Sequence, residues 1–583
     1  MRGTSDPAGA EESGRYAAPR VGPLLLVAGA VLLLGAIVLG LLRDEVSGGG
    51  LIAAVMLAEA VTLLALGLRE RPFAPLPAGA RLAPAAPAPG RRLSTRAVAG
   101  WLAAVTCVGV ALRLGGLDGD LWLDEIVTVR DYASQSVGVI LTRYDGPNNH
   151  LLNSLLAHGA IAAFGYEEWA IRLPALVAGV ATIPAFFWVA RPLVGDVRSL
   201  AAAALLAVSS QHILFSQNAR GYTASLLFGL LATGALVRGL REDRARWWLL
   251  YVATAVLCVA AVPTGGFVVA GHVLVCAVVV LRRRAGGALA PLLGRLALVF
   301  GAVVALTLQL YAPVIGKIGP AAQEAWNEPG AGSALLSREF FRGLADDVSA
   351  GAGPLVLVLA LPVLVAGVLG ARSLLRRDWV LPVALTAGPL LHAGIVVVRG
   401  LAFSPRFLLF LVFPILLVAV EAIAVVAGWL APVLGTADRS RRGLEVAGLV
   451  LAAAALALPL VRTAGLDKQP YREALAHARS LRPDGLVIGV YPADSGVLYY
   501  GVDRADGAAL VPGDTVGVAR TLPDLEALLR SSREPVLVTS QESVLRDARP
   551  ALLARVERDF VPEETFPAAI GGGDITVWLP RPG

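Results

Sequence analysis

Two acidic side chains stand side by side in the run Leu121-Trp122-Leu123-Asp124-Glu125, which follows closely on a mostly apolar stretch at 97–117. A charge next to a membrane segment is costly unless it has a partner or a function. A tryptophan beside it suits the membrane interface, where an amphipathic ring is well accommodated. We therefore predict that Asp124 is a general base at the membrane surface. The alternative is a solvated loop acid.

Arginines near the ends of apolar stretches offer a second chemical group. Arg220 and Arg406 are flanked by small or aromatic residues, and Arg172 begins an apolar stretch. Arginine presents a planar set of donors that match phosphate oxygens, so a lipid phosphate is a natural ligand. The alternative is a side chain that snorkels to the interface, and this alternative weighs most for Arg172.

The composition indicates a chain that crosses a membrane many times. Of 583 residues, 56% are hydrophobic and only 16% are charged, and the mean hydropathy of +0.68 excludes an ordinary soluble protein. The net charge of +6 is small for this length and reflects basic cytoplasmic loops rather than nucleic-acid binding. The cysteines, which all lie inside apolar runs, indicate neither a disulfide framework nor a metal site.

Apolar stretches of nearly spanning length predict about thirteen membrane helices. They lie at 21–42, 50–68, 97–117, 169–190, 199–215, 221–238, 247–263, 266–281, 295–315, 353–371, 379–398, 406–430 and 444–462. The first of them is expected to remain as a signal anchor, because it is too long for a cleaved signal peptide. Clusters of arginine occur in alternate loops, which are therefore cytoplasmic by the positive-inside rule.

This topology predicts a multi-pass protein of the cell (plasma) membrane with a cytoplasmic N-terminus and an extracytoplasmic C-terminal domain. It requires that Asn149–Gly165, which carries His150, Asn153 and His158, lies at the outer surface instead of spanning. It also brings several polar residues to the outer face. Among them, Trp122, Tyr144 and Asn149 are expected to contact the acceptor or the sugar.

Four segments follow from these boundaries. Residues 1–71 form a two-helix membrane module, 72–96 an Ala- and Pro-rich cytoplasmic linker, and 97–466 the transmembrane catalytic domain. Within the last, the long outer loop at 316–352 is expected to be a lid over the site. Strand-like and helix-like runs alternate in 467–583, which predicts a small extracytoplasmic α/β domain.

A carboxylate base together with arginines that bind phosphate indicates a glycosyl transfer. In this reaction an acceptor hydroxyl loses its proton to Asp124 as it attacks the anomeric carbon of a sugar held on a lipid phosphate. The phosphate then leaves, and arginine stabilises its charge together with His150. Such a displacement inverts the anomeric centre.

The chain resembles the GT-C fold membrane glycosyltransferases, and within them the branch similar to protein mannosyltransferases and aminoarabinose transferases. The resemblance covers about 97–414. It rests on the motifs Leu121-Trp-Leu-Asp-Glu125, Asn148-Asn-His-Leu-Leu-Asn153, Phe164-Gly165, Arg172-Leu-Pro174, Ala219-Arg-Gly-Tyr222 and Pro405-Arg-Phe407. It implies a polyprenyl-phosphate-linked sugar, mannose or arabinose-like, as the donor substrate, and a protein, glycan or lipid acceptor.

The resemblance also implies roles for individual residues. Asp124, with Glu125 beside it, would be catalytic, and the donor phosphate or its carrier would contact Arg220, Tyr222, His150 and Arg406. The family often has His-Pro-Pro where this chain has Asn148-Asn149-His150, so the alignment of His150 is open. Some GT-C enzymes use a divalent metal, but the sequence shows no convincing ligand cluster beyond Asp124 and Glu125, and no metal site is predicted.

Two functions of other classes compete with the enzyme. A transporter or flippase of a lipid-linked sugar would place polar residues at mid-membrane and break its helices in repeated halves. A non-catalytic membrane scaffold would leave Asp124, Arg220 and Arg406 without a common purpose. The polar residues of this chain gather at the outer ends of the predicted helices, which favours the enzyme.

Overall fold

The structure is a computed structural model of the full chain. It describes residues 29–67 except 31, 35 and 38–48; 76–283 except 84–89, 91 and 147; 289–319; 355–399; 405–462 except 435 and 436; 465–502; 515–569 except 533; and 573–582. The chain divides into two compact units, Met1–Pro75 and Leu76–Gly583. In the first unit α2 spans Gly49–Gly67. The predicted helix at 21–42 lies largely outside the described residues, and so does the predicted lid from residue 320 onward.

The second unit begins with a helical part. Its helices are η1 (Ala78–Ala80), α3 (Thr95–Leu114), α4 (Leu123–Thr128), η2 (Val129–Ala133), α5 (Val137–Thr142), α6 (Leu151–Phe164), α7 (Glu168–Ala207), α8 (Ser210–Ser216), α9 (Tyr222–Glu242), α10 (Ala245–Ala261), η3 (Pro263–Gly265), α11 (Gly266–Arg282), α12 (Leu289–Tyr311), η4 (Ala312–Val314), α15 (Leu355–Arg377), α16 (Val380–Arg399), η5 (Pro405–Leu411), α17 (Val412–Val433) and α18 (Ala437–Arg462).

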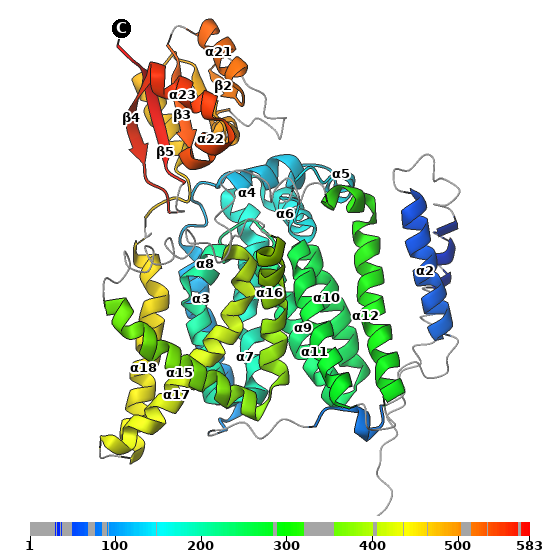
Figure 1. Ribbon diagram of the computed structural model, residues 1–583. Helices are drawn as coiled ribbons and strands as arrows, with labels where there is room; N and C mark the ends of the chain where they lie inside the picture. Colours follow the sequence, from blue (N-terminus) through cyan, green and yellow to red (C-terminus); the bar gives the residue numbers. More distant parts are fainter. Residues whose placement is uncertain are drawn as a thin grey trace, which may run out of the picture. The chain divides into compact units, whose positions relative to one another are not determined.

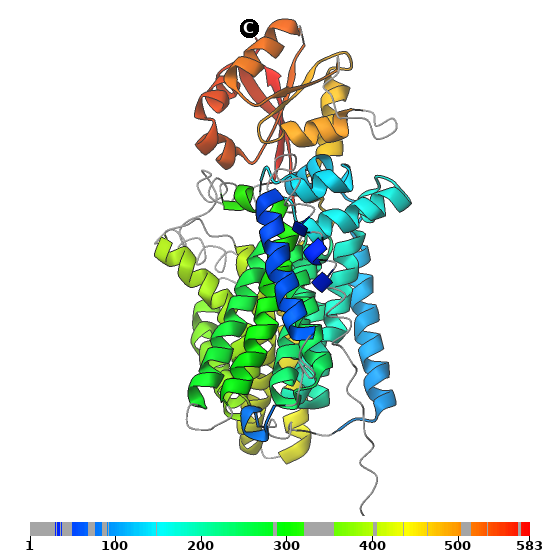
Figure 2. The same ribbon diagram turned by 90° about the vertical axis from the view of Figure 1, so that its right-hand side faces the viewer.

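This part is a polytopic helical membrane domain. Within the described ranges, eight helices are long and apolar enough to cross a membrane. The predicted total of about thirteen stays a prediction. Helices α9, α10, α11 and α12 run side by side in both views (Figures 1 and 2).

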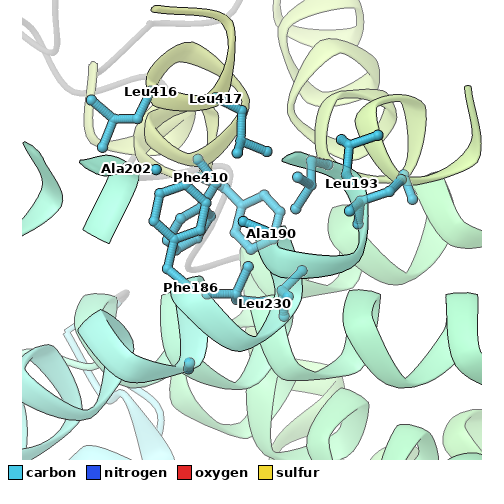
Figure 3. Close-up of a cluster of buried hydrophobic side chains, with 14 of the residues drawn as sticks. Phe186, Ala190, Leu193, Ala202, Leu230, Phe410, Leu416 and Leu417 are labelled. Atoms are coloured by element: carbon cyan, nitrogen blue, oxygen red, sulfur yellow. The ribbon is translucent and has the colours of Figure 1, made fainter. Parts of the chain in front are cut away.

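The core of the helical part lies where α7, α9, η5 and α17 meet. The rings of Phe186 and Phe413 pack with their centroids 5.1 Å apart, and Phe410 packs against Phe413. Figure 3 shows Phe186, Leu230 and Phe410 in this cluster. Because these helices are held by tight apolar packing, they form a rigid support for the polar loops at their ends.

One predicted stretch ends earlier than hydropathy indicates. The stretches at 169–190 and 199–215 correspond to the two helical parts of α7, which are separated by a break at Gly195, whose φ of 81° suits glycine. The second part ends at Ala207, where the buried Arg113 side chain donates to the carbonyl oxygens of Leu206 and Ala207.

Helix α6 lies within the segment 149–165. The predicted topology requires that this segment lies at the membrane surface and does not span the membrane. The helix has 14 residues, which is too short to cross a bilayer core of about 30 Å. It lies with α4 and α5 at one end of the helical part (Figure 1). This placement agrees with the surface helix predicted from the sequence.

The predicted C-terminal α/β domain is present. Its elements are α19 (Tyr471–Leu481), β1 (Val487–Val490), α20 (Asp494–Gly501), β2 (Val516–Ala519), α21 (Leu522–Ser531), β3 (Val536–Ser540), α22 (Glu542–Ala548), α23 (Pro550–Asp559), β4 (Phe560–Phe566) and β5 (Ile575–Pro580). They form one sheet of order β2-β1-β3-β5-β4. Strand β1 pairs in parallel with β2 and β3, while β5 runs antiparallel to β3 and β4.

Candidate active site

Asp124 lies in the first turn of α4, the short helix that the Leu121–Glu125 run begins. Trp122 is the N-cap residue of this helix, and its backbone N–H donates to the Glu125 carboxylate at 3.2 Å. Asp124 and Glu125 are neighbours on a helix, so their side chains point to different sides. Glu125 faces inward, whereas the Asp124 side chain keeps 24% of its surface exposed.

Two arginines from distant segments converge on Asp124. Its Oδ2 lies 3.2 Å from Arg220 NH1 and 3.1 Å from Arg406 NH1. Arg220 comes from the turn between α8 and α9, and Arg406 from the start of η5. The structure therefore brings together three of the residues that the sequence predicted for the chemistry.

Arg220 is held almost entirely inside the protein. Only 3% of its side chain is exposed, yet its Nε has no hydrogen-bond partner. Its NH1 also donates to the Asn148 side chain, and the ring of Tyr222 lies 5.7 Å from its Cζ atom. A buried guanidinium with a free donor is costly unless a ligand completes its hydrogen bonds, and an anion does so best.

His150 lies next to Arg220, and its imidazole ring is neutral. Its Nδ1 accepts from the backbone N–H of Gly221 at 2.9 Å, so the proton of the neutral ring resides on Nε2. That Nε2 lies 3.3 Å from Arg220 NH2. Burial, and then the charges of Arg220 and Arg406, lower the pKa of His150 well below its ordinary value. His150 therefore offers one N–H donor next to the arginine donors.

A pocket opens between these polar groups and the interior of the helical part. Tyr222 and Arg406 lie at its polar side. Its remaining lining comes from α9, the turn at Thr264, α11, α16 and η5, and is mostly apolar: Ser225, Leu226, Val262, Thr264, Gly265, Phe267, Val268, Pro389, His392, Leu409 and Phe410. The guanidinium of Arg406 at one side and mostly apolar walls elsewhere suit a phosphate on a hydrocarbon chain.

The structure corrects the roles predicted for Glu125 and Arg172. Both side chains are fully buried and paired, with Arg172 NH2 2.8 Å from Glu125 Oε2. The other Arg172 donors go to backbone oxygens of Leu117, Gly119 and Asp120. Arg172 therefore has no donor left for a phosphate. The pair instead fixes the loop that precedes α4.

Glu125 is an ionised structural group with its acceptors occupied. Burial alone would raise its pKa, but the charges of Arg172 and Lys468 outweigh burial and lower the pKa to about 2. Lys468 Nζ lies 3.3 Å from Glu125 Oε2, and the backbone N–H of Ala219 donates to Oε1 at 2.6 Å. A carboxylate in this state is unsuited to take a proton, so the catalytic role predicted for Glu125 is not supported.

Two of the predicted acceptor contacts also lie inside the protein. Tyr144 packs among apolar side chains, including Ile140 and Tyr311, because its ring fills the space beneath α5. Asn149 donates to the carbonyl oxygens of Ile140 and Arg143 and accepts from Ser154, which holds the corner before α6. Trp122 is half-buried beside Asp124, and its indole N–H has no hydrogen-bond partner, so its predicted contact stays open.

Sequence reasoning missed the contribution of the C-terminal domain. Lys468, Gln469 and Tyr500 all contact the loop that carries Asp124. Their partners lie more than three hundred residues earlier, and nothing in the local sequence marks such pairs. Within the described residues, there is also no group of three or more His, Cys, Asp or Glu side chains that could hold a metal ion.

Residues 150–308 match the family model described as Dolichyl-phosphate-mannose-protein mannosyltransferase. This match confirms the resemblance predicted from the sequence motifs, and the class of enzyme that it implies, a glycosyltransferase. No curated protein matches the chain significantly.

Two solved structures are similar to this chain in architecture. ArnT from Cupriavidus metallidurans in the apo state is 16% identical, with a TM-score of 0.49 over 83% of this chain and 98% of that one. The archaeal oligosaccharyltransferase AglB from Archaeoglobus fulgidus, in complex with an inhibitory peptide and a dolichol-phosphate, is 14% identical, with a TM-score of 0.48 over 79% of this chain and 72% of that one.

Proposed function

We propose that this membrane glycosyltransferase moves a sugar, mannose or arabinose-like, from a polyprenyl-phosphate donor to an acceptor hydroxyl, and that Asp124 is the general base. The observation that carries the proposal is the contact of Asp124 with both Arg220 and Arg406, because Arg406 also lines the mostly apolar pocket. The family description, which names a dolichyl-phosphate sugar, supports the class of donor.

The donor phosphate binds to Arg220, Arg406 and the Nε2–H of His150, and Tyr222 borders the same space. The lipid chain follows the apolar wall of the pocket. Because the phosphate takes guanidinium donors away from Asp124, the carboxylate is released as a proton acceptor only when the donor is in place. Substrate binding and activation of the base are thereby coupled.

The transfer is a single displacement. The acceptor oxygen forms a bond to the anomeric carbon while the bond from that carbon to the phosphate oxygen breaks. The hydroxyl proton goes to Asp124, and the phosphate leaves with the electron pair, its new charge stabilised by the two arginines. The anomeric configuration is inverted. The acceptor is a protein, glycan or lipid hydroxyl.

Basic clusters in alternate loops support a site on the outer face of the cell membrane, with the N-terminus in the cytoplasm and the C-terminal domain outside. The gathering of polar groups at this one end of the helical part favours the enzyme over a transporter or a scaffold.

The test is sugar transfer by the purified protein with polyprenyl-phosphate sugars. Asp124→Asn is expected to lower turnover by roughly 10²- to 10⁴-fold. Binding of polyprenyl phosphate should be retained, because the neutral amide no longer competes for the arginines. Asp118→Asn is the matched control, since Asp118 is an exposed carboxylate in the loop that precedes α4. Undiminished turnover in Asp124→Asn would refute the general base.

A further inference from the structure

We infer that the C-terminal domain is a positioning element for the catalytic carboxylate, acting through Gln469 and Tyr500. The inference rests on the proposed role of Asp124 and deepens it. The loop before α4 has no regular structure of its own from Gly116 to Trp122, so its backbone groups need partners from elsewhere.

Two backbone donors on either side of Trp122 are held by the C-terminal domain. The N–H of Leu121 donates to the Tyr500 hydroxyl at 2.6 Å, and the N–H of Leu123 donates to Gln469 Oε1 at 2.7 Å. Leu123 is the first residue of α4 and directly precedes Asp124. These two bonds therefore set where the helix starts, and with it the direction of the Asp124 side chain.

Ion pairs from the same part of the chain secure the loop further. Arg472 donates from its backbone N–H and its NH1 to the Asp120 carboxylate, at 2.7 and 2.8 Å. Lys468 pairs with Glu125 and also donates to the carbonyl oxygen of Gln217. The residues just before and just after Asp124 are thus held from one side by 468–472 and Tyr500.

The opposite side of the loop is held by the membrane domain. Arg172 of α7 donates to the backbone oxygens of Leu117, Gly119 and Asp120 and pairs with Glu125. Asp124 is left pointing away from both supports, toward Arg220 and Arg406. A side chain that acts on a substrate has to be held within about 0.5 Å of its productive position. The geometry assigns part of that support to the C-terminal domain.

Tyr500→Phe is the sharpest test, because it removes one oxygen and keeps the ring. That ring stacks near Tyr471 and faces the Arg472 guanidinium at 4.7 Å, and both contacts survive the change. We expect kcat to fall roughly ten- to hundredfold, as for a slightly misplaced catalytic group, with the KM for the lipid donor unchanged. Gln469→Leu should act in the same direction.

A double mutant separates positioning from general stability. If Tyr500 acts through Asp124, Tyr500→Phe will have no further effect on the residual turnover of Asp124→Asn. Thr539→Val is the matched control, because it deletes a buried hydroxyl that accepts from Trp578 inside the sheet, away from the loop. Its kcat per folded molecule should equal that of the wild type. An equal loss in Thr539→Val, or additive losses in the double mutant, would overturn the inference.

Hydrogen exchange tests the support without any need for activity. Amide exchange in a peptide covering 119–126 should become faster in Tyr500→Phe and in Gln469→Leu, and stay unchanged in Thr539→Val. If amide exchange becomes faster in these two variants but the wild-type protein transfers no sugar, the proposed function is refuted and the positioning role is kept. Unchanged exchange in both variants would refute the positioning role alone.

Discussion

At the scale of single residues, the site has more cationic donors than one carboxylate can use. Asp124 offers the single oxygen Oδ2 to both Arg220 and Arg406, while Arg220 Nε has no partner and His150 keeps an N–H. An anion with several acceptor oxygens satisfies these donors better than the carboxylate does. The arrangement of these donors therefore suits a phosphate.

Arg220→Lys should weaken the binding of polyprenyl phosphate. A lysine carries one compact ammonium group and cannot contact Asp124, Asn148 and a phosphate at once, as the planar guanidinium can. Loss of one charge-assisted hydrogen bond corresponds to roughly 1.5–3 kcal/mol of binding free energy. Titration of the purified protein with the lipid phosphate measures it. The control is Arg143→Lys, an exposed arginine that pairs with Asp145. Equal affinity in Arg220→Lys and wild type would contradict the assignment.

The sequence predicted which residues would gather here but not which of them face the ligand. Arg220, Arg406, His150 and Asp124 meet because topology places all of them at one membrane face. Arg172 lies at the same face, yet it turns inward to Glu125. The two are 47 residues apart, and this pairing depends on how α7 packs against the loop, which local sequence does not encode.

At the scale of elements, the position of Arg220 depends on a close approach of two backbones. Gly221 precedes α9 and lies against the end of α10. A Cβ atom there would overlap the carbonyl oxygen of Ala261 and come within 2.8 Å of its carbonyl carbon and 3.3 Å of the His150 Cβ atom. A larger residue has to push α9, with Arg220 and His150, away from α10.

Gly221→Ala should therefore lower both stability and turnover. Overpacking of this kind costs roughly 1–3 kcal/mol of unfolding free energy. The N–H of Gly221 also holds His150, so the phosphate donors shift together. Gly266→Ala, at the start of α11, is the control, because its added Cβ would meet no atom within 4 Å. Thermal unfolding in detergent and transfer assays would show the difference. A Gly221→Ala protein as stable and active as Gly266→Ala would argue against the close approach.

Helices and strands with a clear hydrophobic pattern could be predicted from the sequence. Elements that form only because they pair with a neighbouring strand could not. The apolar runs at 486–491 and 535–539, which the sequence indicates as strands, contain or overlap the buried strands Val487–Val490 and Val536–Ser540. Strand β4, Phe560–Phe566, was missed because it contains a proline and two glutamates and exposes its middle residues. Such a sequence suits an edge strand, and only the pairing with β5 makes it one.

At the scale of the whole molecule, ion pairs connect the two ends of the second unit. Lys468 reaches Glu125 across 343 residues, and Arg472 reaches Asp120 across 352. Hydropathy and the positive-inside rule predicted that both segments lie outside the membrane, but not that they touch. Glu125 pairs with two cations, Arg172 and Lys468, so one positive charge is in excess in a buried place.

That excess charge predicts a pH-dependent stability. Burial, and then the neighbouring Arg172, lower the pKa of Lys468 from 10.5 to about 7. Between these values the unfolded chain keeps the proton that the folded protein has released, so the free energy of unfolding rises with pH, by up to about 1.4 kcal/mol per unit. Below pH 7 both states hold the proton and the full cost of the buried charge is present.

Lys468→Met removes this titration while keeping an unbranched side chain of similar length. The variant should gain most over the wild type near pH 6.5, and its advantage should shrink as the pH rises toward 9, because the wild-type lysine becomes neutral there. Thermal unfolding across this range measures both slopes. Lys317→Met serves as the control, since Lys317 is exposed and should leave the wild-type slope unchanged. A wild-type stability that falls over the same window, or a difference between Lys468→Met and wild type that does not vary with pH, would show that Lys468 stays charged beside Glu125.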